Sequence, residues 1–263
     1  MEKMRARVDK LRENDLPGED SVHDMAIAEG KSREEIRDIL KEKVEDCDRT
    51  IGGPLVDQLA DMQSTQILKT KETKEQAWID ELTKLRNRRA YNKDIPKNMA
   101  SVYKREGGKC SLLFFDLDSF KRVNDTHGHG AGDTVLKELA SLINNTLIRE
   151  SDIAYRWGGE EFVAYLPNTN IDGAKKVAER IRQEVEKYVF NVANKEGKAI
   201  ELKITVSIGC SSTESNKINR EMESEEILQE LERESNSALH DAKHVGKNRV
   251  IAYGEKPKNA EIF

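Results

Sequence analysis

Three acidic residues stand where a buried strand and a tight turn would present them to a ligand. Asp116 follows the apolar run 111–115, and a carboxylate at the end of such a run is costly to bury unless it is paired or binds a cation. Glu160 and Glu161 follow Gly158-Gly159, a pair that accepts the positive φ of a hairpin turn. If the strands on either side are neighbours, we expect Asp116 and Glu160 to converge.

Two converging carboxylates favour one particular chemistry. Mg²⁺ takes hard oxygen ligands and keeps several of them from its substrate, so paired acids on adjacent strands suit a metal that bridges phosphates. Asp118 lies two residues after Asp116 and could share its face. The alternative is a set of solvated loop acids whose charge is balanced by Arg156 or Lys121.

The apolar pattern after residue 80 predicts the elements that position these acids. The expected helices cover residues 87–106, 132–148, 171–189 and 224–244, and the expected strands cover residues 111–118, 153–157, 161–166, 200–210 and 249–253. Residues 124–133 form a polar stretch that contains glycine. Strands mixed with helices in this way predict an α/β domain.

Residues 1–79 have a different composition. They contain no aromatic residue before Trp78 and carry the whole net charge of −5, so they do not readily build a large core. Ser32 and Glu35 have the spacing of a capping box, and Pro54 suits the first turn of a second helix. Two interpretations stay open: an amphipathic helical hairpin that packs on itself or on the main domain, and a pair of dimerisation or signalling helices.

Composition excludes several classes of protein. No run of about 20 apolar residues could span a membrane, and the charged N-terminus does not resemble a signal peptide. Three widely spaced cysteines suit a reducing compartment, and the net charge of −5 argues against nucleic acid as the main partner. We therefore expect a cytoplasmic protein with neither a membrane nor a nucleic-acid partner.

An ordered set of motifs resembles one known family. The segment Arg156–Phe162, which reads RWGGEEF, resembles the signature of the GGDEF family of diguanylate cyclases in its GGEEF form. Other segments similar to the family follow in its order: Asp80–Arg89, Phe115–Thr126, Gly128-His129, Gly132-Asp133, Leu166-Pro167, Ile204–Gly209 and Ala238–Asn248.

The resemblance implies a fold and a division of the chain. The fold would be a palm-like nucleotide-cyclase domain of the α/β (α+β) class, with a central mixed or antiparallel sheet flanked by helices. That domain would cover residues 80–254, after a helical extension over residues 1–79 and before a tail over residues 255–263.

The resemblance also implies an activity. Family members condense two GTP into cyclic di-GMP and release two pyrophosphates, using Mg²⁺ or Mn²⁺ and an antiparallel homodimer in which each subunit holds one GTP. By this likeness Asp116, Glu160 and the carbonyl of Leu117 hold metal. Glu160 would also help to deprotonate the attacking 3′-hydroxyl, with Glu161 as a neighbouring acid. The alternative function is a non-catalytic GGDEF module that binds GTP or cyclic di-GMP.

Further residues are matched to substrate and product by the same resemblance. The substrate-binding set is Asn124, Asp133, Gly158, Gly159, Lys121, Lys243 and Lys247. Within it the amide and the carboxylate would read guanine, the lysines would hold phosphate, and the glycines would let the backbone lie against the nucleotide. Arg149 and Asp152 resemble the family's RxxD inhibitory site for product, although the same spacing is common in helical ion pairs.

Overall fold

The structure is a computed structural model, which describes residues 77–103, 105 and 107–255 together with Ser32, Glu35 and Asp38. The chain divides into two units, Met1–Ala77 and Trp78–Phe263. In the first unit the predicted capping box is present, because Ser32 N donates to Glu35 Oε2 at 2.7 Å and Glu35 N donates to Ser32 Oγ at 3.4 Å. The rest of the predicted helical extension and the tail beyond residue 255 lie outside the described residues.

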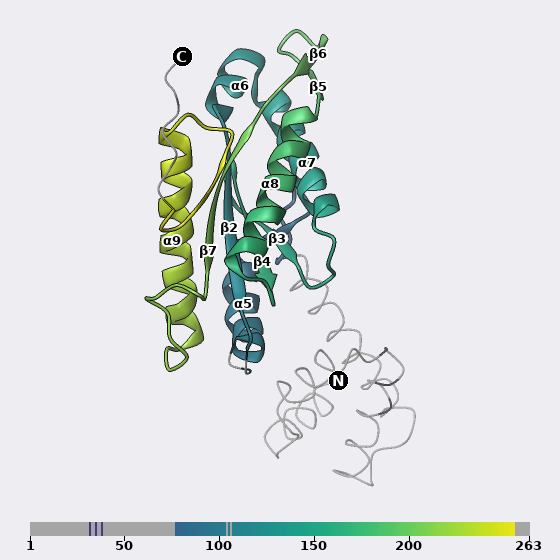
Figure 1. Cartoon of the computed structure of the whole chain (residues 1–263). Helices are drawn as coiled ribbons and strands as arrows, with labels where there is room; N and C mark the ends of the chain where they lie inside the picture. The colour runs from purple at the N-terminus through teal and green to yellow at the C-terminus, as the bar shows by residue number, and fades with distance from the viewer. Residues whose placement is uncertain are drawn as a thin grey trace, which may run out of the picture. The chain divides into compact units, whose positions relative to one another are not determined.

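The second unit alternates strands and helices. In chain order its elements are β1 (Arg86–Asn87), α5 (Arg88–Val102), β2 (Cys110–Leu117), α6 (Phe120–His127), α7 (His129–Thr146), β3 (Ile153–Gly158), β4 (Glu161–Pro167), α8 (Ile171–Lys187), β5 (Phe190–Ala193), β6 (Ala199–Leu202), β7 (Val206–Ser212), α9 (Ser224–His244) and β8 (Val250–Ala252) (Figure 1). Within this part of the chain, no helix is both long and apolar enough to cross a membrane.

Six strands form one mixed sheet in the order β1-β3-β4-β2-β7-β8. The inner strands β3, β4, β2 and β7 pair antiparallel, whereas β1 and β8 pair parallel at the two edges. The central strand β2 is buried along its whole length, which explains its continuous apolar run. The predicted mixed sheet flanked by helices is therefore confirmed.

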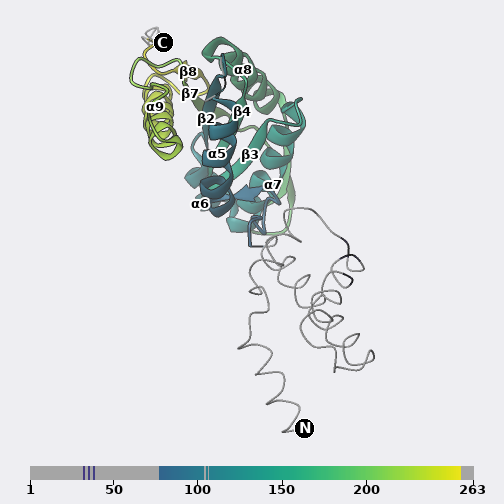
Figure 2. The same ribbon diagram turned by 90° about the horizontal axis from the view of Figure 1, so that it is seen from below.

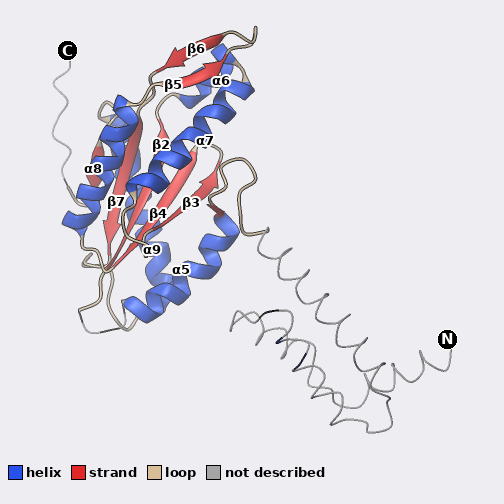
Figure 3. Ribbon diagram, turned by 90° about the vertical axis from the view of Figure 1, so that its right-hand side faces the viewer, coloured by secondary structure: helices blue, strands red, loops and turns tan. Residues whose placement is uncertain are grey.

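Helices cover both faces of this sheet. One face packs its buried residues against α7 and α8, and the other packs against α5 and α9 (Figures 2 and 3). On the second face Gly209 of β7 meets the backbone of α9 so closely that a Cβ atom there would collide with Ser235 O and Leu239 N. A side chain at position 209 would therefore push α9 away from the sheet.

Local capping explains where several helices begin. Asn87 Oδ1 accepts from the backbone N–H groups of Arg89 and Ala90 at the start of α5. Asn170 caps α8 by accepting from Gly173 N at 3.0 Å. Glu223 and Glu226 form a reciprocal capping box at the start of α9.

One predicted strand is wrong. Residues 200–210 are not continuous, because β6 ends at Leu202 and β7 begins at Val206. β6 pairs with β5 in a separate two-stranded sheet, and β7 pairs with β2 and β8 in the main sheet. The alternating apolar residues run across the break, so periodicity alone did not reveal it.

The polar stretch 124–133 is mostly helical. It contains the end of α6 and the start of α7, which meet at Gly128, whose φ is 92°. The turn between β5 and β6 lies against this junction, since Lys195 Nζ donates to the carbonyl of Asp125 at 2.7 Å. The glycines of this stretch therefore serve a break between two helices as well as a polar surface.

Candidate active site

Asp116 lies near the carboxyl end of β2 and is 5% exposed. Its Oδ2 atom accepts from Lys243 Nζ at 2.5 Å. Its Oδ1 atom is buried and has no hydrogen-bond partner among the described residues. Burial raises the pKa of Asp116 above its ordinary value, with Lys243 opposing the rise and the charge of Asp118 adding to it. One carboxyl oxygen is thus held by a cation while the other is left open.

The pairing of β4 with β2 brings the two glutamates of the predicted hairpin to Asp116. Residues of β3 and β4 pair antiparallel around Gly158-Gly159, and the φ of Gly159 is 51°. Asp116 is directly opposite Glu161 in the register of β2 and β4. Burial and then the charge of Asp116 raise the pKa of both Glu160 and Glu161, while Lys243 acts against the rise. Three carboxylates therefore share one small region of unfavourable negative charge.

Arg156 holds this turn without neutralising its acids. Its guanidinium donates to the carbonyl of Gly159 from Nη2 at 2.9 Å and to Asp80 Oδ1 from Nη1 at 2.8 Å. Asp80 also accepts from Thr83 N and Thr83 Oγ1. Arg156 therefore pairs with the first motif of the domain, and Lys243 is the cation that pairs with Asp116.

Asp118 does not share the role of Asp116. It is 8% exposed, and its carboxylate accepts from Thr205 Oγ1 at 2.6 Å, Ser207 Oγ at 2.7 Å and the backbone N–H of Asn248 at 2.9 Å. Beside it, Ser119 Oγ accepts from Lys247 Nζ at 2.8 Å. We call residues 118–119 together with residues 247–248 the clasp, because they join the end of β2 to the loop after α9.

The two predicted guanine readers lie on adjacent helices. Asn124 is in α6 and half-buried, and Asp133 is in α7 and exposed. The side chain of Asn124 lies over Gly132, where a Cβ atom would collide with its Oδ1 atom. Lys121 is exposed on α6, one turn before Asn124. The glycine before Asp133 thus allows the two readers to come close together.

The residues of this region fit a divalent cation that is shared with a ligand. Among the described residues, no three side chains of His, Cys, Asp or Glu gather closely enough to hold a metal. The open Oδ1 atom of Asp116 nevertheless offers a buried anionic ligand beside the glutamates of the turn. Mg²⁺ commonly takes one or two carboxylates and completes its ligands with water and substrate phosphate.

The predicted inhibitory residues lie at the other end of the β3–β4 hairpin. Asp152 N donates to the carbonyl of Arg149 at 3.0 Å in the turn before β3, and Arg149 Nη1 donates to Thr169 Oγ1 at 3.2 Å. The strand β3 has six residues and ends at Gly158, so the turn lies about 20 Å from that glycine at about 3.3 Å per residue. The two sets of residues therefore belong to two separate places on the domain.

Arg180 of α8 lies beside Asp152, and the sequence did not predict this neighbour. Burial raises the pKa of Asp152, which Arg149 and Arg180 oppose by their positive charge. Asp152 Oδ1 and Arg180 Nε are both buried without a hydrogen-bond partner among the described residues. Arg180 Nη2 donates to the carbonyl of Thr146 at 2.8 Å. An arginine in the middle of a periodic helix offered no local signal that it would lie beside Asp152.

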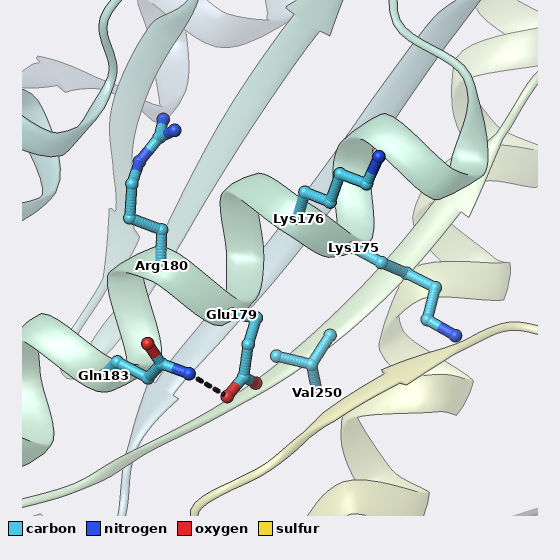
Figure 4. A pocket seen from close by; sticks show the side chains of 6 residues that line it. All are labelled: Lys175, Lys176, Glu179, Arg180, Gln183 and Val250. Atoms are coloured by element: carbon cyan, nitrogen blue, oxygen red, sulfur yellow. Dashed lines mark hydrogen bonds between the residues drawn. The ribbon is translucent and has the colours of Figure 1, made fainter.

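Arg180 is also one of the residues that line a hollow on α8 and β8. It is lined by Lys175, Lys176, Glu179, Arg180, Gln183 and Val250 (Figure 4). Glu179 and Gln183 lie together, with Nε2 of Gln183 donating to Oε1 of Glu179 at 2.9 Å, whereas Arg180 points away from Val250. None of the site residues predicted from the sequence lines this hollow.

Comparison with known proteins agrees with this geometry. The family model described as diguanylate cyclase, GGDEF domain, matches residues 77–249. This chain belongs to the GGDEF family. The match contains the GGEEF turn, the clasp and the turn at Arg149, so the two places described above lie within one GGDEF domain.

Individual relatives resemble the same part of the chain. Diguanylate cyclase A of Treponema denticola is 41% identical over 140 residues, which are 53% of this chain and 34% of that protein. The solved coiled coil and GGDEF domain of DgcB from Caulobacter crescentus, in complex with c-di-GMP, is 28% identical with a TM-score of 0.61, covering 75% of this chain and 98% of that one. The active GGEEF domain of a diguanylate cyclase from Vibrio cholerae is 31% identical with a TM-score of 0.52, covering 65% and 98%.

The curated relatives are longer than the region of likeness. This chain spans between about a third and about half of the length of the first curated relatives that it matches. The likeness therefore shows the family of the domain.

Proposed function

We propose that this GGDEF domain is a diguanylate cyclase that condenses two GTP into cyclic di-GMP with release of two pyrophosphates. The observation that carries the proposal is the open carboxyl oxygen of Asp116 beside Glu160 and Glu161, with Lys243 at the other oxygen. Raised pKa values of three neighbouring acids are typical of a functional site. The GGEEF relative from Vibrio cholerae, whose domain is called active, supports the same conclusion.

Mg²⁺ is the cofactor that this arrangement suits, with Mn²⁺ as a substitute. The carboxylates of Asp116 and Glu160 and the carbonyl oxygen of Leu117 would hold it, and when bound it neutralises charge on the phosphates. In the chain without metal, burial and the charge of Asp116 raise the pKa of Glu160, and the charge of a bound cation would lower it again. Glu160 would accept the proton of the 3′-hydroxyl that attacks the α-phosphorus, with Glu161 beside it.

The rest of the substrate would be held by residues of α6, α7, α9 and the loop after α9. Asn124 and Asp133 would read the guanine edge, since a carboxylate accepts two N–H donors and an amide both donates and accepts. Lys243 and Lys247 would hold the triphosphate, and Lys121 would add a third positive charge from α6. At Gly158 and Gly159 a Cβ atom would meet only open space, which leaves the backbone accessible to the nucleotide.

The chemistry requires two subunits, because each GTP supplies its 3′-hydroxyl to the other. We therefore propose an antiparallel homodimer of domains over residues 80–254, with residues 1–79 as the helices that fix how the two domains face each other. The rate per subunit would then rise with protein concentration until all subunits are in dimers. Removing residues 1–79 would shift that rise to a higher concentration.

Product would bind at the far end of the hairpin. Arg149 and Asp152 would take a guanine edge or a phosphate of cyclic di-GMP, and Arg180 would add a second guanidinium. The buried open atoms at Asp152 Oδ1 and Arg180 Nε support this proposal, because unpartnered polar atoms cost free energy that a ligand recovers. Bound product would lock the domains in an unproductive arrangement.

The central experiment incubates the full chain with GTP and Mg²⁺ and identifies the product by mass. We expect cyclic di-GMP and two pyrophosphates for each molecule formed, and no product from an Asp116→Asn variant. GTP binding without any product from a verified dimer would reject the cyclase and favour the non-catalytic GGDEF module.

A second experiment tests the product site. Arg149→Ala should weaken inhibition by cyclic di-GMP about tenfold or more, the scale of losing a charged hydrogen-bonding group, while the uninhibited rate stays the same. Initial rates at several product concentrations measure this. Unchanged inhibition would remove Arg149 from the site.

A further inference from the structure

Asn248 is fixed from two directions. Within the clasp its backbone N–H donates to Asp118 Oδ2 at 2.9 Å. Its side chain reaches α8, where Nδ2 donates to Glu186 Oε1 at 2.6 Å and Oδ1 accepts from Arg182 Nη1 at 2.8 Å. The backbone and both ends of the amide are engaged, so the residue is tied to β2 through one group and to α8 through two.

The two partners on α8 are themselves held in place. The Arg182 side chain is 13% exposed, and its Nη1 atom also donates to Glu186 Oε2 at 3.0 Å. Its Nη2 atom donates to Glu179 Oε1 at 2.7 Å. The hydrogen bond from Asn248, followed by that from Arg182, lowers the pKa of Glu186. A charged, ordered pair therefore faces the amide of Asn248.

The backbone next to Asn248 needs such support. Gly246, Lys247 and Asn248 have φ values of 118°, 62° and 46°. The left-handed region is sparsely populated for residues other than glycine, and it persists where the surroundings determine it. The position of Lys247 Nζ at Ser119 Oγ depends on this backbone.

We propose that Asn248, Arg182 and Glu186 are positioning residues for Lys247 and that they set the affinity of the domain for the triphosphate of GTP. This inference rests on the proposed function, because it takes Lys247 as a phosphate ligand. An ammonium held in place binds a polyanion more tightly than a mobile one, since its ordering cost is met before binding. The guanine readers lie on α6 and α7. Loss of the positioning residues should therefore weaken binding of the triphosphate without weakening binding of the guanine base.

The test replaces the amide without straining the backbone. Asn248→Gly keeps the left-handed conformation accessible and removes both contacts to α8. Calorimetry on the full chain with Mg²⁺ would compare a GTP analogue that carries an α,β-methylene bridge, and so cannot be cyclised, with GMP. We expect affinity for the analogue to fall about tenfold, or about 1.4 kcal/mol, while affinity for GMP stays within about twofold.

Two further variants separate positioning from general stability. Glu179→Gln removes a charged partner of Arg182 but leaves the bonds of Asn248, so nucleotide affinity should not change. Asn248→Asp combined with Glu186→Gln exchanges the amide and the carboxylate between the two positions. The exchanged pair can still hydrogen-bond and still accepts from Arg182, so affinity for the analogue should recover, whereas Asn248→Asp alone sets two carboxylates against each other.

Each outcome decides the inference. Unchanged affinity of Asn248→Gly for the analogue would overturn it, as would an equal loss for the analogue and GMP. Failure of the exchanged pair to recover, with a melting temperature like that of the wild type, would overturn it as well. A wild-type chain that binds no analogue would reject the proposed function and the inference with it, which distinguishes that failure from the others.

Discussion

Two groups of polar residues lie at the same end of the sheet: the clasp, and the acid turn, which we define as Asp116, Glu160 and Glu161. They differ in whether their carboxylates have hydrogen-bond partners within the protein. In the acid turn the carboxylates have raised pKa values, and Asp116 keeps one oxygen without a partner in the described part of the chain. In the clasp Asp118 accepts three hydrogen bonds. Asp118 is therefore fully paired within the protein, whereas Asp116 keeps one oxygen open at the place where we propose that the ligand binds.

The largest expected effect concerns the open side of this comparison. Glu160→Gln removes the proposed base and a metal ligand at almost constant volume, so turnover should fall by about 10²-fold or more. Initial rates of cyclic di-GMP formation measure this, and the control is a melting temperature that does not fall below that of the wild type, since the raised pKa of Glu160 means that its charge does not stabilise the fold. A loss of only a few fold would argue against Glu160 in either role.

The second largest effect is expected in the clasp, where Asp118 has three hydrogen-bond donors. Asp118→Ala leaves Thr205 Oγ1, Ser207 Oγ and Asn248 N without their acceptor, and should lower the free energy of unfolding by about 2–4 kcal/mol. Urea unfolding measures this. Ser207→Ala is the matched control, since it removes one of these hydrogen bonds and should cost about 1 kcal/mol. If the two variants are equally stable, the clasp does not hold this end of the sheet.

The smallest expected effect is a gain in stability, in contrast to the loss expected for Asp118→Ala. The pKa of Asp116 is raised in the folded chain, so the folded state takes up a proton at a higher pH than the unfolded state does. The contribution of Asp116 to stability is therefore full below the ordinary value of 3.8 and is lost as pH rises through the folded pKa. Asp116→Asn does not titrate, so its melting temperature should gain on that of the wild type by a few degrees across this window.

Melting curves of both proteins at several pH values, without nucleotide or metal, would test this prediction. A variant whose melting temperature does not gain on that of the wild type as pH rises would show that the ion pair with Lys243 outweighs the cost of burial. In that case the acid turn would resemble the clasp, and the contrast between the two regions would be lost.

Local patterns in the sequence predicted much of this architecture. The sequence predicted that Asp116 would lie near Glu160 and Glu161 only if β2 and β4 were neighbours, which they are. The apolar run of β2 and the hairpin turn at the two glycines were predicted from local patterns. The periodic apolar pattern of α8 also sufficed. These features depend on spacings of a few residues, which the sequence displays directly.

The remainder depends on contacts between distant segments. From the sequence, Asp118 was expected only to share the face of Asp116, because the donors that satisfy its carboxylate come from residues 205, 207 and 248. The separate sheet of β5 and β6 was missed because the choice between two pairing partners is made in three dimensions. Arg180 was missed for the same reason, because only the packed fold brings the middle of α8 beside Asp152.

The close approach of α9 to β7 at Gly209 has a consequence for how substitutions would be interpreted. Lys243 stands in the last turn of α9 and reaches Asp116 on β2 only while the helix stays at that distance. A larger residue at position 209 would displace the helix and carry the ammonium group away from the acids. Such a substitution would therefore lower activity, although it alters an uncharged residue inside the core.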